Sequence, residues 1–168
     1  MEGHSAEFKG EKADYAHFMT ERLMKAHKPD EINKERRKDM SIEMKPIGYV
    51  STDVEEVPRS YSVSDVEGSL VIDELYLEGL RDIEPGQRIY VIFHFHLSPK
   101  FTSQFMRIKP PIRTKKVGVF STHSPFRPNP IGLSLLEVLG VDGNVIRVKG
   151  LDMVDRTPIL DIKPEICR

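Results

Sequence analysis

The fold class is indicated first by the stretch RIYVIFHFHL, residues 88–97, in which two kinds of side chain alternate. Successive side chains of a β-strand point to opposite faces, so this alternation predicts a strand over residues 88–97. The face directed toward a core would then carry large apolar groups at every second position. That face comprises Ile89, Val91, Phe93, Phe95 and Leu97, and the other face comprises Tyr90, Ile92, His94 and His96.

Shorter apolar segments lie on both sides of this stretch and are separated by turn residues. Asp142-Gly143-Asn144 is typical of a hairpin turn between two such segments. Many short strands without a regular alternation of strands and helices favour a mainly β fold, a barrel or a sandwich. The further strands are expected at residues 47–51, 70–77, 117–120, 133–141, 145–149 and 159–162.

The first 45 residues have a different pattern. Tyr15, Phe18, Met19 and Leu23 follow the spacing of one face of an amphipathic helix. Pro29 would end this helix, and Asp30 could cap a second helix that runs to Met40. We therefore expect residues 1–45 to form a helical extension, packed on the domain or on a second subunit, and residues 46–168 to form one domain.

Composition limits the classes of protein that fit. The 168 residues suit one main domain, and no apolar run approaches the roughly 18 residues that a membrane span needs. Cys167 is the single cysteine, so an intrachain disulfide is impossible. A reducing compartment follows, and we expect a cytoplasmic protein without a membrane partner.

Charge is distributed unevenly although the net charge is only −1. Residues 85–136 contain no aspartate or glutamate but eight lysines and arginines. Such a strip is typical of a surface for a polyanion, nucleic acid first of all. The alternative is that these cations are solvated or pair with acids elsewhere in the fold. The candidates for RNA contact are Lys109, Arg113, Lys115, Lys116 and Arg127.

His94 and His96 lie two residues apart, so one strand face would carry both imidazoles. Such a pair could begin a metal site, with His123 or Asp161 as the third ligand. The alternative is a pair of polar residues near a pocket, hydrogen-bonded to substrate or backbone. Without further cysteines or an H-E-x-x-H pattern, the sequence favours this alternative, with no metal.

The stretch STHSPFRPNPIG, residues 121–132, places prolines at positions 125, 128 and 130. Proline fixes φ and restricts the residue before it, so this connector should be rigid before any ligand binds. Arg127 and Asn129 would present polar groups from this frame, and Gly132 would permit tight approach of the backbone. An ordinary proline-rich connector is the alternative.

A second polar segment spans residues 151–164. It holds Asp152 and Asp155, and residues 155–158 indicate a turn whose backbone groups could bind a ligand. Asp161 and Lys163 follow in a short strand and should lie on the same side of it.

Together these two segments resemble the signatures of the TsaA-like (TrmO-type) family. The matching stretches are VGVFSTHSPFRPNPIGLS, residues 117–134, and DRTPILDIKP, residues 155–164. Shorter matches precede these stretches in the order expected for the family, at residues 47–50, 58–59 and 91–94. The resemblance therefore covers about residues 47–165.

This resemblance implies a β-barrel enzyme that works as a homodimer. It implies a tRNA methyltransferase that uses S-adenosylmethionine and modifies N6 of the threonylcarbamoylated adenosine at position 37, in the anticodon loop. The cofactor contacts that the family pattern implies are Pro58, Arg59, Ser60, His94, Phe95, His123, Leu133, Asp155, Arg156, Thr157 and Pro158.

Three positions depart from the family pattern. His123 stands where arginine is frequent, Arg156 replaces a turn glycine, and Glu165 replaces a tyrosine. The charge at position 123 therefore becomes titratable, and position 156 must avoid or tolerate a positive φ.

Methylation of a nitrogen that bears a proton is helped by a base, and the candidates are His123 and Asp161. Asn129, followed by Pro130, is comparable to the asparagine–proline motif of other N6-adenine methyltransferases, where acceptor oxygens surround the exocyclic nitrogen. Two other classes remain open at this point. One is a metal-dependent barrel enzyme built on His94 and His96, and the other is a non-catalytic RNA-binding module.

Overall fold

The computed structural model describes residues 42–111 and 113–166. The chain divides between Glu43 and Met44 into two units, of which the second contains nearly all of the described residues. The helical extension expected over residues 1–45 lies outside the described residues except for residues 42–45, which have no regular secondary structure. Among the described residues, no helix has the length and apolar character needed to cross a bilayer.

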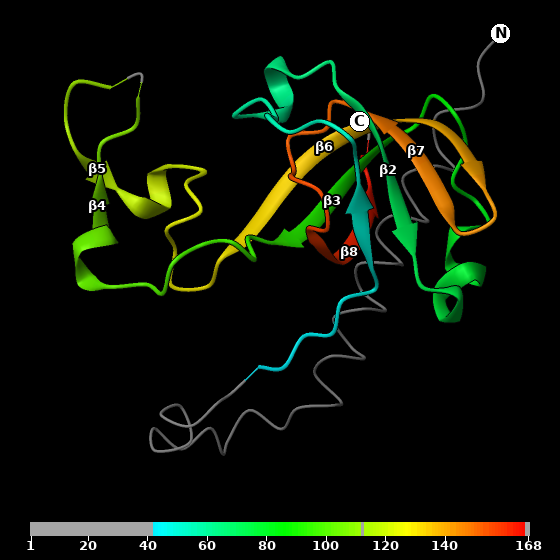
Figure 1. Cartoon of the computed structure of the whole chain (residues 1–168), viewed down its shortest axis with the longest axis horizontal. Coiled ribbons are helices and arrows are strands. Elements are labelled where there is room, and N and C mark those ends of the chain that lie inside the picture. The colour runs from blue at the N-terminus through cyan, green and yellow to red at the C-terminus, as the bar shows by residue number, and fades with distance from the viewer. Residues whose placement is uncertain (1–41, 112, 167–168) are drawn as a thin grey trace, which may run out of the picture. The chain divides into compact units, whose positions relative to one another are not determined.

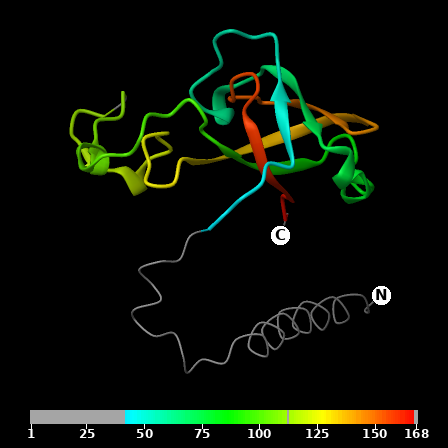
Figure 2. The same ribbon diagram turned by 60° about the horizontal axis from the view of Figure 1, so that its bottom comes forward.

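The main sheet is antiparallel throughout and closes on itself, because its last strand also pairs with its first. Figure 1 shows these strands around one centre, and in Figure 2 the cyan β1 lies beside the red β8. The mainly β class expected from the sequence is confirmed. The hydrogen-bonded order is β1 (Gly48–Ser51), β2 (Glu67–Ile72), β7 (Val145–Lys149), β6 (Ile131–Asp142), β3 (Arg88–His94) and β8 (Pro158–Pro164).

The interior of this barrel is filled by the apolar face of each strand. On β3 the predicted inward set is confirmed for Ile89, Val91 and Phe93, which are buried. Each fully buried aliphatic or aromatic side chain contributes about 1.5–3 kcal/mol to folding. The core comprises Val50, Leu70, Ile72, Leu80, Ile89, Val91, Phe93, Leu136, Val138, Ile146, Val148, Leu151, Met153 and Ile159.

The predicted extension of the β3 strand to Leu97 is wrong, since the strand ends at His94. The backbone N–H of Phe95 still donates to Pro130 (2.8 Å), but the N–H of His96 turns back to the carbonyl of His94 (2.8 Å). Because β6 begins opposite His94, the strand has no further partner for its backbone groups. Leu97 is consequently 74% exposed instead of buried.

Two other predicted strands are partly 3₁₀ helix. Residues 70–77 split into the end of β2 and η3 (Glu74–Leu80), because the Asp73 side chain caps the N–H of Leu75 at 3.0 Å. Residues 117–120 split into β5 (Val117–Gly118) and η5 (Val119–Ser121). The remaining 3₁₀ helices are η2 (Tyr61–Val63) and η4 (Ser103–Met106).

The late strands agree well with the sequence. The predicted segment 133–141 becomes β6, two residues longer at its start, and 145–149 is β7 as expected. Gly143 has φ of +57°, as the predicted hairpin turn requires. The Asn144 side chain then donates to the carbonyl of Ile72 at 2.6 Å, which ties this turn to the end of β2.

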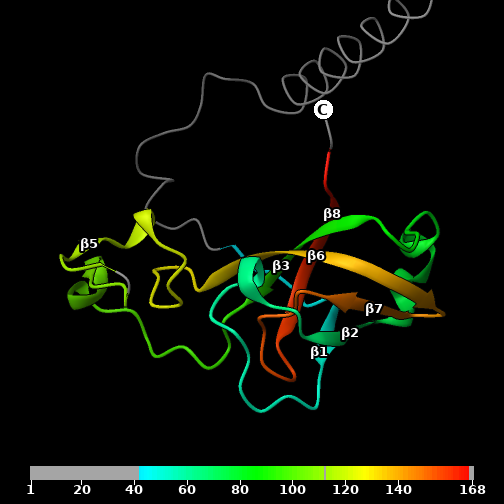
Figure 3. The ribbon, with the colours of Figure 1, turned by 90° about the horizontal axis from the view of Figure 1, so that it is seen from above.

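A long connection joins β3 to β6 and carries the basic strip. Within it, β4 (Arg107–Ile108) pairs with β5 in a small ribbon that is not part of the barrel. Figures 1 and 3 both show this ribbon away from the barrel, and Figure 3 shows β6 leading back from it along the barrel. We call residues 99–118 the basic excursion, and residues 121–130 the proline loop.

Candidate functional site

The proline loop is held by bonds within itself. The Thr122 hydroxyl donates to the carbonyl of Val119 at 2.6 Å, and the Arg127 guanidinium donates to the carbonyl of Thr122 at 2.8 Å. The N–H of Phe126 donates to the Ser124 hydroxyl at 3.2 Å. These bonds, together with the restricted φ of the prolines, define the loop conformation without a ligand.

The proline loop forms one wall of a cavity of about 450 Å³, which we call the proline-loop cavity. The other walls come from the strand that follows the loop and from segments that are distant in sequence. They are residues 59–61, the end of β3, the first four residues of β6, and Asp152. The first signature segment, residues 117–134, therefore lines this cavity through the loop and β6, whereas Asp152 stands three residues before the second signature segment, residues 155–164.

A smaller cavity of about 280 Å³, the aromatic cavity, adjoins the first. The two cavities share Phe93, Phe95, Pro125 and Asp152 as wall residues. The rings of Phe93 and Phe95 meet edge to face, with centroids 5.0 Å apart. The aromatic cavity is completed by His96, Leu97, Ser98, Pro99, Phe126, Met153, Val154 and Thr157.

Asp152 is the half-buried carboxylate between these cavities. It accepts hydrogen bonds from the Ser134 hydroxyl at 2.5 Å and from the backbone N–H of Tyr61 at 2.7 Å. Burial raises the pKa of Asp152 above its ordinary value, although those two bonds and the nearby His123 imidazole act in the opposite direction. A carboxylate with a raised pKa in a cavity wall is typical of a functional site.

Gly132 explains how the cavity floor is packed. A Cβ atom at this position would collide with the ring of Phe93, so any larger residue would displace that ring. The group packed against Gly132 is the Phe93 ring, which lines both cavities, so the tight backbone approach expected at this position stays a prediction.

The structure brings together about half of the cofactor contacts that the family pattern implies. Arg59, Ser60, Phe95, His123 and Leu133 all line the proline-loop cavity. Thr157 lines the aromatic cavity, and so does Phe95. The others, which line neither cavity, are Pro58, His94, Asp155, Arg156 and Pro158.

The turn at residues 155–158 bonds to β1 and to Thr52, and only Thr157 of its four residues lines a cavity of the candidate site. Asp155 accepts a hydrogen bond from the N–H of Thr52 at 3.1 Å, and the N–H of Arg156 donates to Val50 at 2.9 Å. Arg156 keeps the left-handed conformation of the glycine it replaces, with φ of +61°. Its guanidinium lies 4.4 Å from the ring centroid of Tyr49, a cation–π contact that offsets part of this strain.

The predicted catalytic residues are not all in one place. His123 is exposed and lines the proline-loop cavity, whereas Asn129 is exposed and lines neither cavity. Asp161 lines a separate cavity of about 670 Å³ near the end of β8, which we call the β8 cavity. Its carboxylate forms an ion pair with Lys163 at 2.8 Å, and this hydrogen bond raises the pKa of Lys163.

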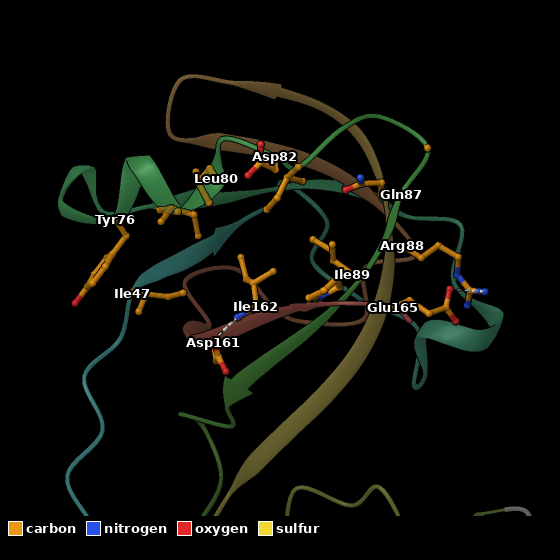
Figure 4. Close-up of a pocket in the computed structure, with 15 residues that line it drawn as sticks. Ile47, Tyr76, Leu80, Asp82, Gln87, Arg88, Ile89, Asp161, Ile162 and Glu165 are labelled. Carbon is orange, nitrogen blue, oxygen red and sulfur yellow. Dashed lines mark hydrogen bonds and ion pairs between the residues drawn. The ribbon is translucent and has the colours of Figure 1, made fainter. Parts of the chain in front are cut away.

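Figure 4 shows the β8 cavity, with Asp161 and Glu165 on the β8 side and Arg88 opposite. Arg88 and Glu165 form an ion pair at 3.4 Å. The departure from the family pattern at Glu165 therefore lies away from both cavities of the candidate site.

Sequence reasoning missed Asp152 and its two donors, Ser134 and Tyr61. A signal existed, because Asp152 stands between two apolar residues, Leu151 and Met153, that are both buried. A carboxylate inside such an apolar stretch is costly unless it is hydrogen-bonded, and so marks a special environment. Ser134 is itself 1% exposed, which leaves its hydroxyl little choice of partner.

The described residues hold no group of three His, Cys, Asp or Glu side chains that could bind a metal ion. His94 belongs to β3, but His96 follows the turn after it and lines the aromatic cavity. The expected placement of both imidazoles on one strand face is therefore wrong, because the strand ends between them.

The predicted RNA contacts are divided. Lys109, Arg113, Lys115 and Lys116 are exposed on the basic excursion, while Arg127 is half-buried and donates within the proline loop. The excursion is attached to the site by stacking of Phe105 on Phe126, with centroids 4.9 Å apart and an interplanar angle of 13°. Phe126 is also a wall residue of the aromatic cavity.

The fold and this site define a small antiparallel barrel with a preformed cavity for an organic ligand beside a basic ribbon. Residues 49–167 match the family described as the tRNA-methyltransferase O N-terminal domain. This chain belongs to that TrmO family.

Individual relatives agree with the match. The chain is 38% identical over 126 residues to a probable S-adenosyl-L-methionine-binding protein from Pyrococcus abyssi, covering 73% of this chain and 67% of the relative. It is 37% identical over 129 residues to a protein of the same description from Methanothermobacter thermautotrophicus, covering 75% of this chain and 91% of that one.

More remote matches connect the chain to named enzymes. It is 41% identical over 88 residues to the tRNA (adenine(37)-N6)-methyltransferase of Mus musculus, covering 52% of this chain and 20% of the enzyme. The crystal structure of TrmO from Pseudomonas aeruginosa superposes with a TM-score of 0.60 and 29% identity, covering 76% of this chain. The match spans 55% of that TrmO chain, so the solved relative is considerably longer than the matched region.

Proposed function

We propose that this protein is a tRNA methyltransferase that transfers a methyl group from S-adenosylmethionine to N6 of adenosine 37. The observation that carries the proposal is the pair of joined cavities at which both signature segments meet. Family membership and the relatives described as S-adenosylmethionine-binding support the cofactor. The Mus musculus relative supports the position and the atom.

The cavity residues suit this cofactor chemically. Arg59 can pair with a carboxylate, and the edge-to-face rings of Phe93 and Phe95 offer an apolar surface for an adenine or a thioether chain. Asp152 and Ser134 can accept hydrogen bonds from hydroxyl or amino groups. The cofactor supplies an electrophilic methyl group on a positively charged sulfur, and the protein's task is to orient two reactants and exclude water.

The basic excursion would hold the RNA. Its exposed lysines and arginine lie in a window without acids, which favours contact with phosphates in a salt-dependent manner. Stacking of Phe105 on Phe126 joins this surface to the wall of the aromatic cavity. An adenosine splayed from the anticodon loop could therefore reach the methyl donor while its neighbours stay on the excursion.

Labelled S-adenosylmethionine and bulk tRNA test the proposal directly. We expect label in an N6-methylated adenosine, and comparison of tRNA with and without threonylcarbamoylation identifies the preferred acceptor. Calorimetric titration with S-adenosylmethionine separates this enzyme from an RNA-binding module, which need not bind the cofactor. Cofactor binding without any label in tRNA would contradict the proposed activity. A homodimer and a cytoplasmic location remain predictions from the sequence.

A further inference from the structure

Asp152 is the single acidic side chain in the walls of the proline-loop and aromatic cavities, within the part of the chain that the structure describes. It lies in the wall of both, so a ligand in either cavity is near its carboxylate. The acids nearest in sequence, Asp155 and Asp161, are engaged by Thr52 and Lys163 and line neither cavity. Asp152 therefore differs from these two acids, because it lines both cavities and neither of them lines either one.

The proposed reaction must dispose of one proton. A nitrogen that carries hydrogen becomes cationic when it is alkylated, so removal of its proton as the new bond forms lowers the barrier. The wall residues that could accept a proton at neutral pH are Asp152, His96 and His123. His123 lines only the proline-loop cavity and His96 only the aromatic cavity, whereas Asp152 lines both.

We propose that Asp152 is the proton acceptor in the methyl transfer, a role that rests on the proposed function. The lone pair of the acceptor nitrogen forms the bond to the methyl carbon, and the electron pair of the carbon–sulfur bond passes to the departing sulfur. The nitrogen's proton passes to the Asp152 carboxylate and then to water. The cofactor loses its positive charge, and no oxidant or reductant is needed.

The surroundings of Asp152 suit this role. Its two donors occupy one site on each carboxylate oxygen, which leaves lone pairs free on both to receive a proton. Burial raises its pKa, so it is a stronger base than an exposed aspartate would be. The charged or titratable neighbours in the same walls are Arg59, Tyr61, His96, His123 and Arg127, and of these the His123 imidazole acts by its charge to lower the pKa of Asp152.

The first test is Asp152→Asn, which preserves the shape of the side chain and its acceptor for the N–H of Tyr61. We expect the single-turnover methylation rate to fall about 10²–10⁴-fold, the usual contribution of a general base. The dissociation constant for S-adenosylmethionine, measured by calorimetry, should change by less than about tenfold, which corresponds to 1.4 kcal/mol. Thermal unfolding verifies that the variant folds.

Asp82→Asn is the matched control, because Asp82 is an exposed acid in the wall of the β8 cavity. Its methylation rate should equal that of the unchanged protein. A similar loss in both variants would mean that the general charge of the protein is responsible, which would overturn the assignment.

The second test uses Ser134→Ala, which removes a hydrogen bond that stabilises the Asp152 carboxylate. Its loss should raise the pKa of Asp152, so the acid limb of the pH–rate profile should move to higher pH. Carbon NMR of the Asp152 carboxyl in the cofactor-free protein should move in the same direction. A purely structural role for Asp152 would leave the acid limb in place.

The outcomes distinguish the two proposals. If the unchanged protein methylates tRNA and Asp152→Asn is equally fast, the role of Asp152 is wrong and the function stands. If Asp152→Asn loses cofactor affinity as much as rate, Asp152 is a binding residue and not the proton acceptor. If the unchanged protein binds the cofactor but methylates no tRNA, the proposed function fails and the assignment of Asp152 fails with it.

Discussion

The two ends of β3 lie beside cavities of opposite character. The β8 cavity, next to Arg88 and Ile89, is the larger at about 670 Å³, and three of its charged wall residues are engaged in the ion pairs Arg88–Glu165 and Asp161–Lys163. The proline-loop cavity, next to Phe93, is smaller at about 450 Å³ and contains Asp152, which forms no ion pair within the described residues.

This difference shows that size alone does not identify the site. An exposed ion pair such as Asp161–Lys163 contributes little to stability, because water screens its charges. A half-buried carboxylate whose pKa is raised by desolvation opposes folding, and this is explained more readily by function than by stability. The comparison therefore assigns chemistry to the smaller cavity.

The largest structural effect is expected from Gly132→Ala, which forces the Phe93 ring out of the floor of the proline-loop cavity. Overpacking of this kind destabilises by about 1–3 kcal/mol, measured by denaturant unfolding. Gly79→Ala is the matched control, because Gly79 lines the β8 cavity and an added Cβ there meets nothing within 4 Å. Equal losses of stability in the two variants would contradict the tight packing of the Phe93 ring against Gly132.

The next largest effect concerns RNA. Changing Lys115 and Lys116 to alanine should weaken tRNA binding and reduce the slope of log affinity against log salt by about one to two, because each phosphate contact contributes 0.7–0.9. Lys45 and Lys149, both exposed and outside the basic excursion, provide a doubly substituted control with the same change in charge. A slope that falls equally in both double variants would reject the excursion as the RNA surface.

Much of the barrel could be predicted from alternation alone. Ile89, Val91 and Phe93 were identified as one face because the strand period is independent of its surroundings. The end of β3 could not be predicted, since residues 95–97 continue the alternation and only the start of β6 shows that no partner remains. Likewise residues 75–77 are apolar but exposed, and the Asp73 cap determines that they form part of a 3₁₀ helix.

The sequence predicted which segments form the candidate site better than it predicted which residues line the cavities. The proline loop and residues 151–164 do meet, but mainly through residues 152–154, and of the turn at 155–158 only Thr157 lines a shared cavity. The predicted turn is present, yet the N–H of Arg156 donates to Val50 of β1 and the Asp155 side chain accepts from the N–H of Thr52, contacts that sequence spacing does not reveal. Asp161 was selected for its charge, and its partner Lys163 and its separate cavity appear only in three dimensions.

The smallest effect is a pH-dependent difference in stability between Asp152→Asn and the unchanged protein. Because the pKa of Asp152 is raised on folding, the folded state binds more protons between the unfolded and folded values, and stability falls as pH rises through that window. The free energy of unfolding, measured in urea, should therefore rise in the variant relative to the unchanged protein as the pH increases from acidic to neutral. A fall in the variant's relative free energy of unfolding over the same pH range would show that folding favours the ionised carboxylate.

The central claim is that the methyl donor binds at the end of β3 where the two signature segments meet. Backbone amide NMR during titration with S-adenosylmethionine tests it most directly. The account predicts the largest shifts at Phe95, Leu133 and Asp152, with residues around the β8 cavity unchanged. Shifts concentrated at Ile47, Gln87 and Glu165 would place the ligand in the larger cavity and contradict the account.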